Sequence, residues 1–352
     1  MTESLDKSID REVSCNRKQI NLALQGGGSH GAFTWGVLDR LLEDEEIELE
    51  AISGTSAGAM NAAVVTSGFC KGGHDGARED LERFWSAVSE AARFSPLQRS
   101  PMDVLFGNWS LGNSPMYQWL DMSAKPFSPY DLNPAGDNPL AGLLEDVVDF
   151  DLLNKSPTKL FITATNVETG QARVFRNPDI SLDVLLASAC LPNIYKTVEI
   201  DGVPYWDGGY SGNPSLGPLV RECSANDTVL VQINPVKRPG IPKTSHEISS
   251  RLNEISFNSS LVKELRMMSV IRKDMPPHQC EASSWGTMRV HLIASDVMLE
   301  LDHTSKMNAE WDFMTMLRDK GREAAGVFLE KHRGDIGKTP TLDLEQFAPD
   351  YV

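Results

Sequence analysis

The sequence has little cysteine, no long apolar run and a shortage of positive charge. No two of its five cysteines have CxxC spacing, so neither a disulfide framework nor a zinc site is indicated. No apolar stretch approaches the roughly 18 residues of a membrane-spanning helix. The polar segment 1–19 lacks the apolar core of a signal peptide. We therefore expect a cytoplasmic protein. The cysteines are Cys15, Cys70, Cys190, Cys223 and Cys280.

The charge balance argues against nucleic acid as a partner. The 33 Lys+Arg and 49 Asp+Glu give a formal net charge of 33 − 49 = −16, whereas nucleic-acid binding needs a basic face that releases counterions. The same excess disfavours electrostatic adhesion to anionic membranes, so we expect at most transient membrane-surface contact through a local apolar patch. The composition is that of a folded chain, with 41% apolar and 23% charged residues. Nothing in it indicates an oligomeric state.

Strands and helices alternate along the first part of the sequence. Short apolar runs that end in glycine-rich turns predict buried strands, and apolar residues at helical spacing follow each turn. This alternation predicts a parallel sheet with helices on its faces. The predicted elements are a strand at 19–25, a helix at 33–42, a strand at 47–53 and helices at 59–65 and around 81–88.

The rest of the sequence predicts more elements of the same domain. Residues 94–139 are rich in Pro, Gly, Asn and aromatics, and predict a loop-rich excursion with one short helix near 116–120. The excursion is either a lid or substrate wall, or an irregular surface insertion. Its Trp109, Trp119 and Phe127 either line an acyl groove or pack a local core. The further elements are strands at 160–167, 172–176, 203–206, 228–233 and 288–294, and helices at 180–189, 245–273 and 305–331.

The run Gly54-Thr55-Ser56-Ala57-Gly58 matches G-x-S-x-G between a predicted strand and a predicted helix. This nucleophile elbow places a serine on a sharp turn, where side chains at the flanking glycines would collide. The following helix points its N-terminal amides towards developing negative charge. Ser56 is therefore the candidate nucleophile, with Gly54 and Gly58 as its structural supports.

The run Gly26-Gly27-Gly28-Ser29-His30-Gly31 has two functional interpretations. It fits the dinucleotide fingerprint G-x-G-x-x-G, but that motif needs an acid at the end of the second strand, and here Glu48 and Glu50 lie near its start. Alternatively, consecutive glycine amides turn towards one point and form an oxyanion hole. A simple tight turn would not require three glycines in a row.

A serine nucleophile needs a base, and Asp207-Gly208-Gly209 ends a short predicted strand. With these three elements together, the sequence resembles the patatin-like phospholipase family over residues 20–214. Two further blocks match in the family order, Ala187-Ser188-Ala189-x-x-Pro192 and Asn213-Pro214. One position departs from the family, because His30 stands where an arginine or lysine is usual, and a neutral imidazole supplies no cation.

The resemblance implies a Ser–Asp dyad of Ser56 and Asp207, with oxyanion amides from Gly26, Gly27 and Gly28. His30, Gly31, Gly54, Gly58, Gly208 and Gly209 would support these motifs. It implies no cofactor, no metal and no catalytic histidine. The implied fold is a three-layer α/β/α architecture with a mainly parallel central sheet and added C-terminal helices. The expected organisation is a polar tail at 1–19, a catalytic core at 20–214, and strands and helices at 215–352 that complete the same domain.

The expected activity is hydrolysis of fatty-acyl esters of phospholipids, lysophospholipids or related lipids. Two alternatives remain, namely an acyl thioesterase or small-ester carboxylesterase on the same site, and a non-catalytic lipid-binding protein. A Ser-Asp-His triad is also open, because four histidines follow the acid in the order that α/β-hydrolases use. His303 is the best triad candidate of these, and His291 is expected to be a core residue. The four histidines are His246, His278, His291 and His303.

Overall fold

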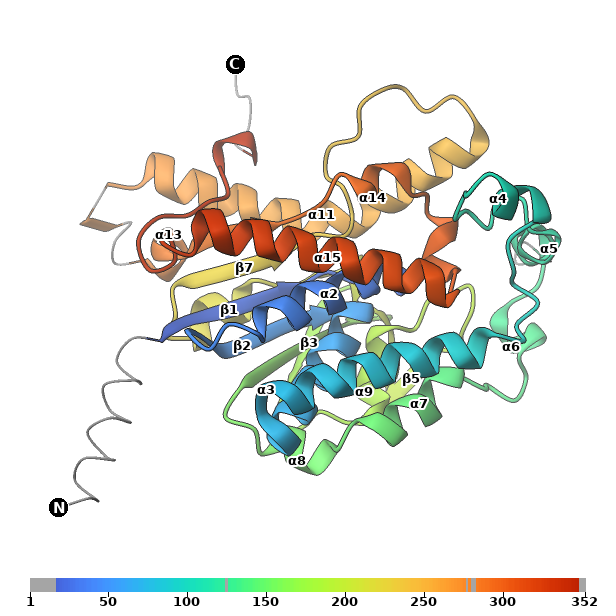
Figure 1. Cartoon of the computed structure of the whole chain (residues 1–352), viewed down its shortest axis with the longest axis horizontal. Helices are drawn as coiled ribbons and strands as arrows, with labels where there is room; N and C mark the ends of the chain where they lie inside the picture. Colours follow the sequence, from blue (N-terminus) through green and yellow to red (C-terminus); the bar gives the residue numbers. More distant parts are fainter. Residues whose placement is uncertain (1–16, 124–125, 277, 280–282, 348–352) are drawn as a thin grey trace.

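The computed structural model describes residues 17–123, 126–276, 278–279 and 283–347. Most of the predicted tail, together with Cys15 and Cys280, lies outside these residues. The described chain forms three layers, in which helices pack on both faces of a central sheet (Figure 1). The three-layer α/β fold predicted from the sequence is therefore confirmed.

The sheet of the described residues has eight strands. They are β1 (Lys18–Leu24), β2 (Ile47–Thr55), β3 (Lys159–Asn166), β4 (Ala172–Arg176), β5 (Val198–Ile200), β6 (Val203–Asp207), β7 (Asp227–Val231) and β8 (Arg289–Ile293). Their order is β5-β6-β3-β2-β1-β7-β8, with β4 paired to β3. The neighbours from β3 to β8 are parallel, whereas β4 and β6 run antiparallel to β3. β1 is therefore a central strand, hydrogen-bonded to β2 on one side and to β7 on the other.

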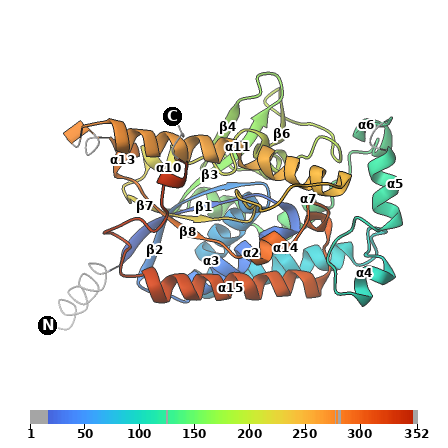
Figure 2. The ribbon, with the colours of Figure 1, turned by 90° about the horizontal axis from the view of Figure 1, so that it is seen from above.

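Helices cover the two faces of the sheet as separate apolar layers. One face carries α2 (Gly31–Leu41), α3 (Ala57–Ala92) and α15 (Trp311–His332), and the other carries α10 (Gly217–Glu222) and α11 (Ser245–Asp274) (Figure 2). Leu22 and Leu24 of β1 point to the first group, and Ala23 points to the second. This division follows from the alternation of side chains along a strand.

α3 consists of two arms that reverse direction at a pair of glycines. Gly72 and Gly73 leave the helical conformation, and Gly73 has a φ of 63° that favours glycine. The second arm runs back along the first, so that Trp85 Nε1 donates a hydrogen bond to Asn61 Oδ1 at 3.0 Å. The two arms correspond to the separate helices that the sequence predicts at 59–65 and around 81–88.

The segment 94–139 contains more helix than the sequence analysis predicts. It forms α4 (Pro101–Leu105), α5 (Pro115–Ser123) and α6 (Pro129–Leu132) before the start of α7 (Pro139–Val147). The expectation of a single short helix is wrong because proline was taken as a loop signal, whereas each of these helices begins at a proline, the residue favoured in a first turn. In Figure 1 the segment lies at one end of the molecule, beyond the carboxyl ends of the parallel strands.

The last predicted helix begins later than expected. Residues 304–307 form a 3₁₀ turn, η3 (Thr304–Met307), and α15 starts only at Trp311. The Asp302 carboxylate accepts hydrogen bonds from the Thr304 and Ser305 amides and so closes a separate turn.

The strand β5 is not predicted from the sequence, because three residues are too few to show a period. The remaining helices are α8 (Phe150–Asn154), α9 (Leu182–Ser188), α13 (Ser284–Thr287) and α14 (Val297–Glu300), with short turns η1 (Gly28–His30), η2 (Gly208–Tyr210) and η4 (Glu345–Phe347).

Within the described ranges, every helix is too short or too polar to cross a bilayer.

Candidate active site

Ser56 lies in the sharp turn between β2 and α3. Its φ of 53° and ψ of −123° fall outside the regions that side-chain-bearing residues favour, and such strain persists only where the surroundings enforce it. The glycines on either side make the turn feasible. A Cβ on Gly54 would lie 2.6 Å from the Gly58 carbonyl oxygen, and one on Gly58 would overlap the Leu24 carbonyl. The G-x-S-x-G run therefore has the strand–turn–helix geometry of a nucleophile elbow.

Ser188, at the end of α9, links this turn to the neighbouring strand through two hydrogen bonds. The Ser56 N–H donates to Ser188 Oγ at 2.9 Å, and the Ser188 hydroxyl donates to the Thr163 carbonyl of β3 at 2.7 Å. The Ser188 side chain is fully buried. The sequence pattern around Ser188 indicates no role for this residue, whereas in the structure its side chain fixes the backbone of the candidate nucleophile.

Asp207 ends β6 beside the Ser56 hydroxyl and is buried. Its Oδ1 accepts a hydrogen bond from the Gly209 N–H at 2.7 Å, whereas Oδ2 has no hydrogen-bond partner among the described residues. Burial raises the pKa of Asp207 to about 6, opposed by the Gly209 amide, the Ser56 hydroxyl and the charge of Lys306. No hydrogen bond of ordinary length joins Ser56 to Asp207 in the described structure, as is common for catalytic pairs without substrate.

The two glycines after Asp207 allow its turn to pass close to its neighbours. A Cβ on Gly208 would overlap the Thr163 carbonyl, and one on Gly209 would overlap the ring of Phe257 in α11. These close approaches place Asp207 at the edge of the sheet where β2 ends and Ser56 follows. Neither position tolerates a side chain without movement of its surroundings.

The loop Gly26–Gly28 follows β1 and passes beside Ser56. A Cβ on Gly26 would lie 2.6 Å from the Ser56 Cβ, so only glycine permits this approach. The Gly26 N–H donates to Asn213 Oδ1 at 2.6 Å and is therefore not free to bind an oxyanion. The expectation that all three glycines supply oxyanion amides is wrong at Gly26. In the described part of the chain the Gly27 and Gly28 amides have no partner and remain available.

The sequence is similar to a known protein family. A profile of the family named patatin-like phospholipase matches residues 22–220. The chain belongs to the patatin-like phospholipase family. The matched residues contain the glycine loop, Ser56, Ser188 and Asp207. The family is one of lipid acyl hydrolases.

Individual relatives are more distant. The uncharacterized protein YjjU of Escherichia coli K12 is 27% identical over 223 residues, which cover 62% of this chain and 52% of YjjU. The match thus spans about half of that relative. The crystal structure of VipD from Legionella pneumophila is similar over 90% of this chain and 67% of that protein, with 15% identity and a TM-score of 0.38.

His30, at the position where the patatin-like family usually has a cation, is a buried neutral residue here. Its Nε2 lies 2.8 Å from Ser305 Oγ, and burial together with the Lys306 charge lowers its pKa to about 3. Gly31, the next residue, packs against Ala57 at the start of α3, where a Cβ would come within 2.7 Å of the alanine methyl. Both residues support the loop without contributing charge.

The histidines considered for a triad lie away from the dyad. His303 Nδ1 is 2.8 Å from Ser250 Oγ and its Nε2 is 3.3 Å from the Tyr117 hydroxyl, so both ring nitrogens are engaged elsewhere. His291 is fully buried in β8, as expected of a core residue. None of the four is hydrogen-bonded to Ser56 or Asp207 within the described residues. His246 pairs with Asp302, His291 pairs with Asp227, and His278 is exposed beyond α11.

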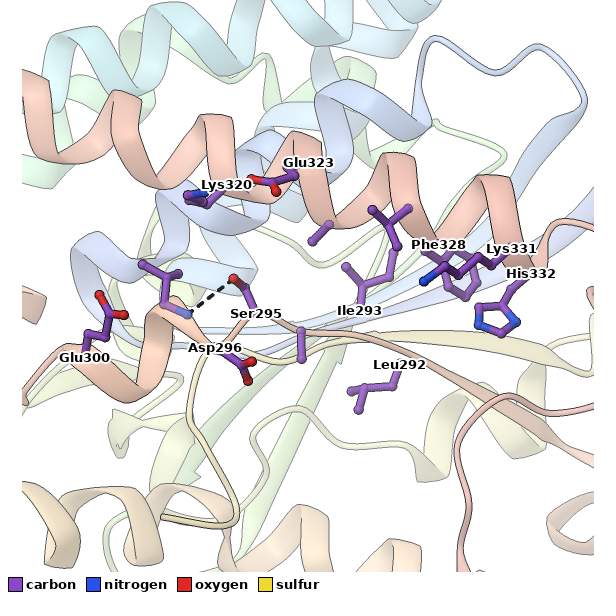
Figure 3. Close-up of a pocket in the computed structure, with 14 residues that line it drawn as sticks. Leu292, Ile293, Ser295, Asp296, Glu300, Lys320, Glu323, Phe328, Lys331 and His332 are labelled. Carbon is purple, nitrogen blue, oxygen red and sulfur yellow. Dashed lines mark hydrogen bonds and ion pairs between the residues drawn. The ribbon is translucent and has the colours of Figure 1, made fainter. Parts of the chain in front are cut away.

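A large cleft of the described structure lies away from this site. It has a volume of about 690 Å³ and lies between β8, α14 and α15, with Lys320, Glu323 and His332 on its walls (Figure 3). Its charged residues are mixed in sign, and no group of three His, Cys, Asp or Glu side chains suited to a metal ion occurs in the described ranges. Size alone therefore does not indicate where the chemistry occurs.

The three aromatic residues considered for an acyl groove, Trp109, Trp119 and Phe127, differ in their burial. Trp109 packs against Phe313 of α15, with ring centroids 5.1 Å apart, and belongs to the core. Trp119 and Phe127 are more than half exposed. The acyl-groove interpretation is thus wrong for Trp109.

Proposed function

We propose that this protein is a serine acyl hydrolase that cleaves fatty-acyl esters of lysophospholipids or phospholipids with the dyad Ser56 and Asp207. The observation that carries the proposal is the buried, unpartnered Asp207 Oδ2 beside the hydroxyl of a strained elbow serine. A carboxylate with a pKa of about 6 is ionised at neutral pH and is more basic than an exposed aspartate. Such a pKa suits a general base.

In the proposed mechanism, Ser56 Oγ attacks the ester carbonyl carbon while Asp207 Oδ2 accepts the hydroxyl proton. The carbonyl oxygen becomes an oxyanion, to which the Gly27 and Gly28 amides donate, and each such donor supplies about 3–4 kcal/mol. The tetrahedral intermediate collapses, and the departing alcohol takes the proton from Asp207. Water then attacks the acyl-enzyme, Asp207 accepts its proton, and Ser56 regains a proton as the fatty acid leaves.

Two other functions are distinguishable from this one. A thioesterase or small-ester carboxylesterase would use the same acyl-enzyme, because that intermediate does not depend on the leaving group. A non-catalytic lipid-binding protein would need neither a strained serine nor a buried carboxylate without a partner, since both cost stability. The geometry therefore favours catalysis, and turnover measurements separate the leaving groups.

The experiment measures fatty-acid release from lysophosphatidylcholine, from a long-chain acyl-CoA and from a short-chain ester, with the wild type and Ser56→Ala. We expect the highest kcat/KM on the lysophospholipid and none above background in the variant. A preference for acyl-CoA would assign a thioesterase. Hydrolysis of all three at the wild-type rate by Ser56→Ala would contradict the dyad.

An exposed apolar surface also supports transient contact with lipid. Leu105 and Phe106 of the α4 region are 74% and 75% exposed, and Ile241 in the loop before α11 is 80% exposed. Both segments lie at the end of the molecule beyond the carboxyl ends of the parallel strands (Figures 1 and 2). We propose that this surface contacts neutral or zwitterionic lipid, because a net charge of −16 disfavours an anionic membrane.

This contact is tested with phosphatidylcholine vesicles and a double variant, Leu105→Ser with Phe106→Ser. The variant should hydrolyse a soluble short-chain ester like the wild type but co-sediment less with vesicles. Val327→Ser, which removes an apolar side chain that is 43% exposed on α15, is the control. Unchanged co-sedimentation of the double variant, or no binding by the wild type, would exclude this surface as a lipid contact.

A further inference from the structure

Lys306 lies beside the glycine loop, although it comes from η3, outside the residues that match the family. Its carbonyl packs so closely on Gly28 that a Cβ there would overlap it. Its ammonium donates to Asn234 Oδ1 at 2.8 Å and to Asn253 Oδ1 at 2.6 Å. Asn234 Nδ2 in turn donates to the Gly26 carbonyl at 2.7 Å. Lys306 therefore supports both ends of the loop that carries the available amides.

The positive charge of Lys306 is not cancelled by an ion pair in the described structure. The acid that acts on it from α11, Glu254, is itself paired with Arg238 at 2.6 Å and with Arg251 at 3.0 Å. The ammonium is held by two neutral amide oxygens instead. Burial lowers the pKa of Lys306 to about 8, an effect that Glu254 and Asp207 oppose. At neutral pH the site thus contains a buried cation whose field extends beyond its own contacts.

Phe257 contacts both the Lys306 ammonium and the turn that follows the candidate base. Lys306 Nζ is 5.2 Å from the centroid of its ring, and the same ring packs against Gly209, whose amide holds Asp207. The charge of Asp207 acts on two further titratable groups, the thiol of Cys190 and the hydroxyl of Tyr210. Both are neutral at physiological pH, because burial raises their pKa values to about 11 and about 12.

The remaining groups around Lys306 supply no competing cation. His30 is neutral, and burial together with the Lys306 charge lowers the pKa of His303. The carboxylate of Asp302, on the same segment, is hydrogen-bonded to Thr304, Ser305 and His246. Lys306 is therefore the charged group within the described residues that stabilises ionised Asp207 and lowers its pKa.

We propose that Lys306 is a positioning residue of the acyl-hydrolase site, which holds the Gly26–Gly28 loop and keeps Asp207 ionised as the base. This inference rests on the proposed function and adds to it a residue beyond the matched segment. Activity then requires a deprotonated Asp207 and a protonated Lys306. The pH profile of kcat/KM should be bell-shaped, with an acid limb from the first group and an alkaline limb from the second.

The test compares pH profiles on a soluble short-chain ester for the wild type, Lys306→Arg and Lys306→Met. Arginine stays charged across the range, so Lys306→Arg should lose the alkaline limb. Lys306→Met carries no charge at any pH, so it should lower the maximum of kcat/KM, lack the alkaline limb and move the acid limb upwards. An upward shift of about one pH unit lowers the rate at pH 6, relative to that maximum, about fivefold. Lys320→Met, on the exposed face of α15, should leave the profile unchanged.

A second variant keeps the test decisive if Lys306→Met does not fold. Asn253→Asp places a carboxylate against the ammonium with little change in shape, and it should also move the acid limb upwards. If the pH profile of kcat/KM kept its wild-type shape in all variants, with or without a uniform fall in kcat/KM at every pH, the role of Lys306 would be overturned. A wild-type protein that hydrolyses no ester would instead contradict the proposed function.

Discussion

The Ser188 hydroxyl accepts a hydrogen bond from the Ser56 amide at 2.9 Å and donates one to the Thr163 carbonyl at 2.7 Å. Ser188 thus links the elbow that carries the candidate nucleophile to the adjacent strand β3. Because Ser56 has strained backbone angles, its turn needs such enforcement to persist. The geometry of the site depends on a residue that does not touch the reacting atoms.

Ser188→Ala should lower kcat on a soluble ester by one to two orders of magnitude, because the Ser56 turn loses its anchor. The free energy of unfolding should fall by about 1–3 kcal/mol, the cost of leaving a buried amide without a partner. Ser86→Ala in the second arm of α3 is the control and should change neither quantity. An unchanged kcat in Ser188→Ala would show that the turn holds without this link.

Asp207→Asn should abolish turnover and stabilise the protein at neutral pH. Asp207 has a folded pKa of about 6, above its ordinary value of 3.8, so the fold prefers the protonated form. Its contribution to stability is complete below about pH 4 and is lost as the pH rises through about 6. At pH 8 the variant should therefore be more stable by about 2–3 kcal/mol. Thermal unfolding at pH 4 and pH 8 checks this, and an inactive variant that is less stable at pH 8 would contradict the assignment.

The sequence predicted the central part of the fold well, because its signals are local. The parallel strands end in glycine turns, and the helices that follow have clear apolar spacing. The elbow at Ser56 and the turn at Asp207 were predicted from motif and family resemblance, and the structure places both at one edge of the sheet. The short helices α4, α5 and α6 were missed because their prolines were taken as loop signals.

What the sequence could not predict depends on contacts between distant segments. The engagement of the Gly26 amide arises because Asn213 reaches back to the loop. Lys306 was placed in a predicted helix, and only the turn closed by Asp302 brings it to Gly28. Neither contact has a period or a motif that marks it in the sequence.

Gly28→Ala should inactivate the protein. Gly28 has a φ of 58°, and a Cβ there would overlap the Lys306 carbonyl, so the loop must move and misdirect its amide. Loss of one oxyanion donor alone costs about 10²–10³ in kcat. Gly142→Ala in α7, where a Cβ meets nothing within 4 Å, is the matched control. If Gly28→Ala kept wild-type kcat, this loop would not form the oxyanion hole.

His303→Ala should leave kcat on a soluble ester within about twofold of the wild type. Both of its ring nitrogens are occupied by Ser250 and Tyr117, so it does not serve as a base in this arrangement. The assay is run beside Asp207→Asn on the same substrate. A loss of several orders of magnitude in His303→Ala would assign a Ser-Asp-His triad and replace the dyad.

The most direct test of the central claim treats the pure protein with a fluorophosphonate probe and maps the labelled peptide by mass spectrometry. We expect a single adduct on Ser56, which is absent in Ser56→Ala, strongly reduced in Asp207→Asn and retained in His303→Ala. An adduct on another residue, or no adduct on Ser56 in the wild type, would contradict a Ser56 nucleophile activated by Asp207.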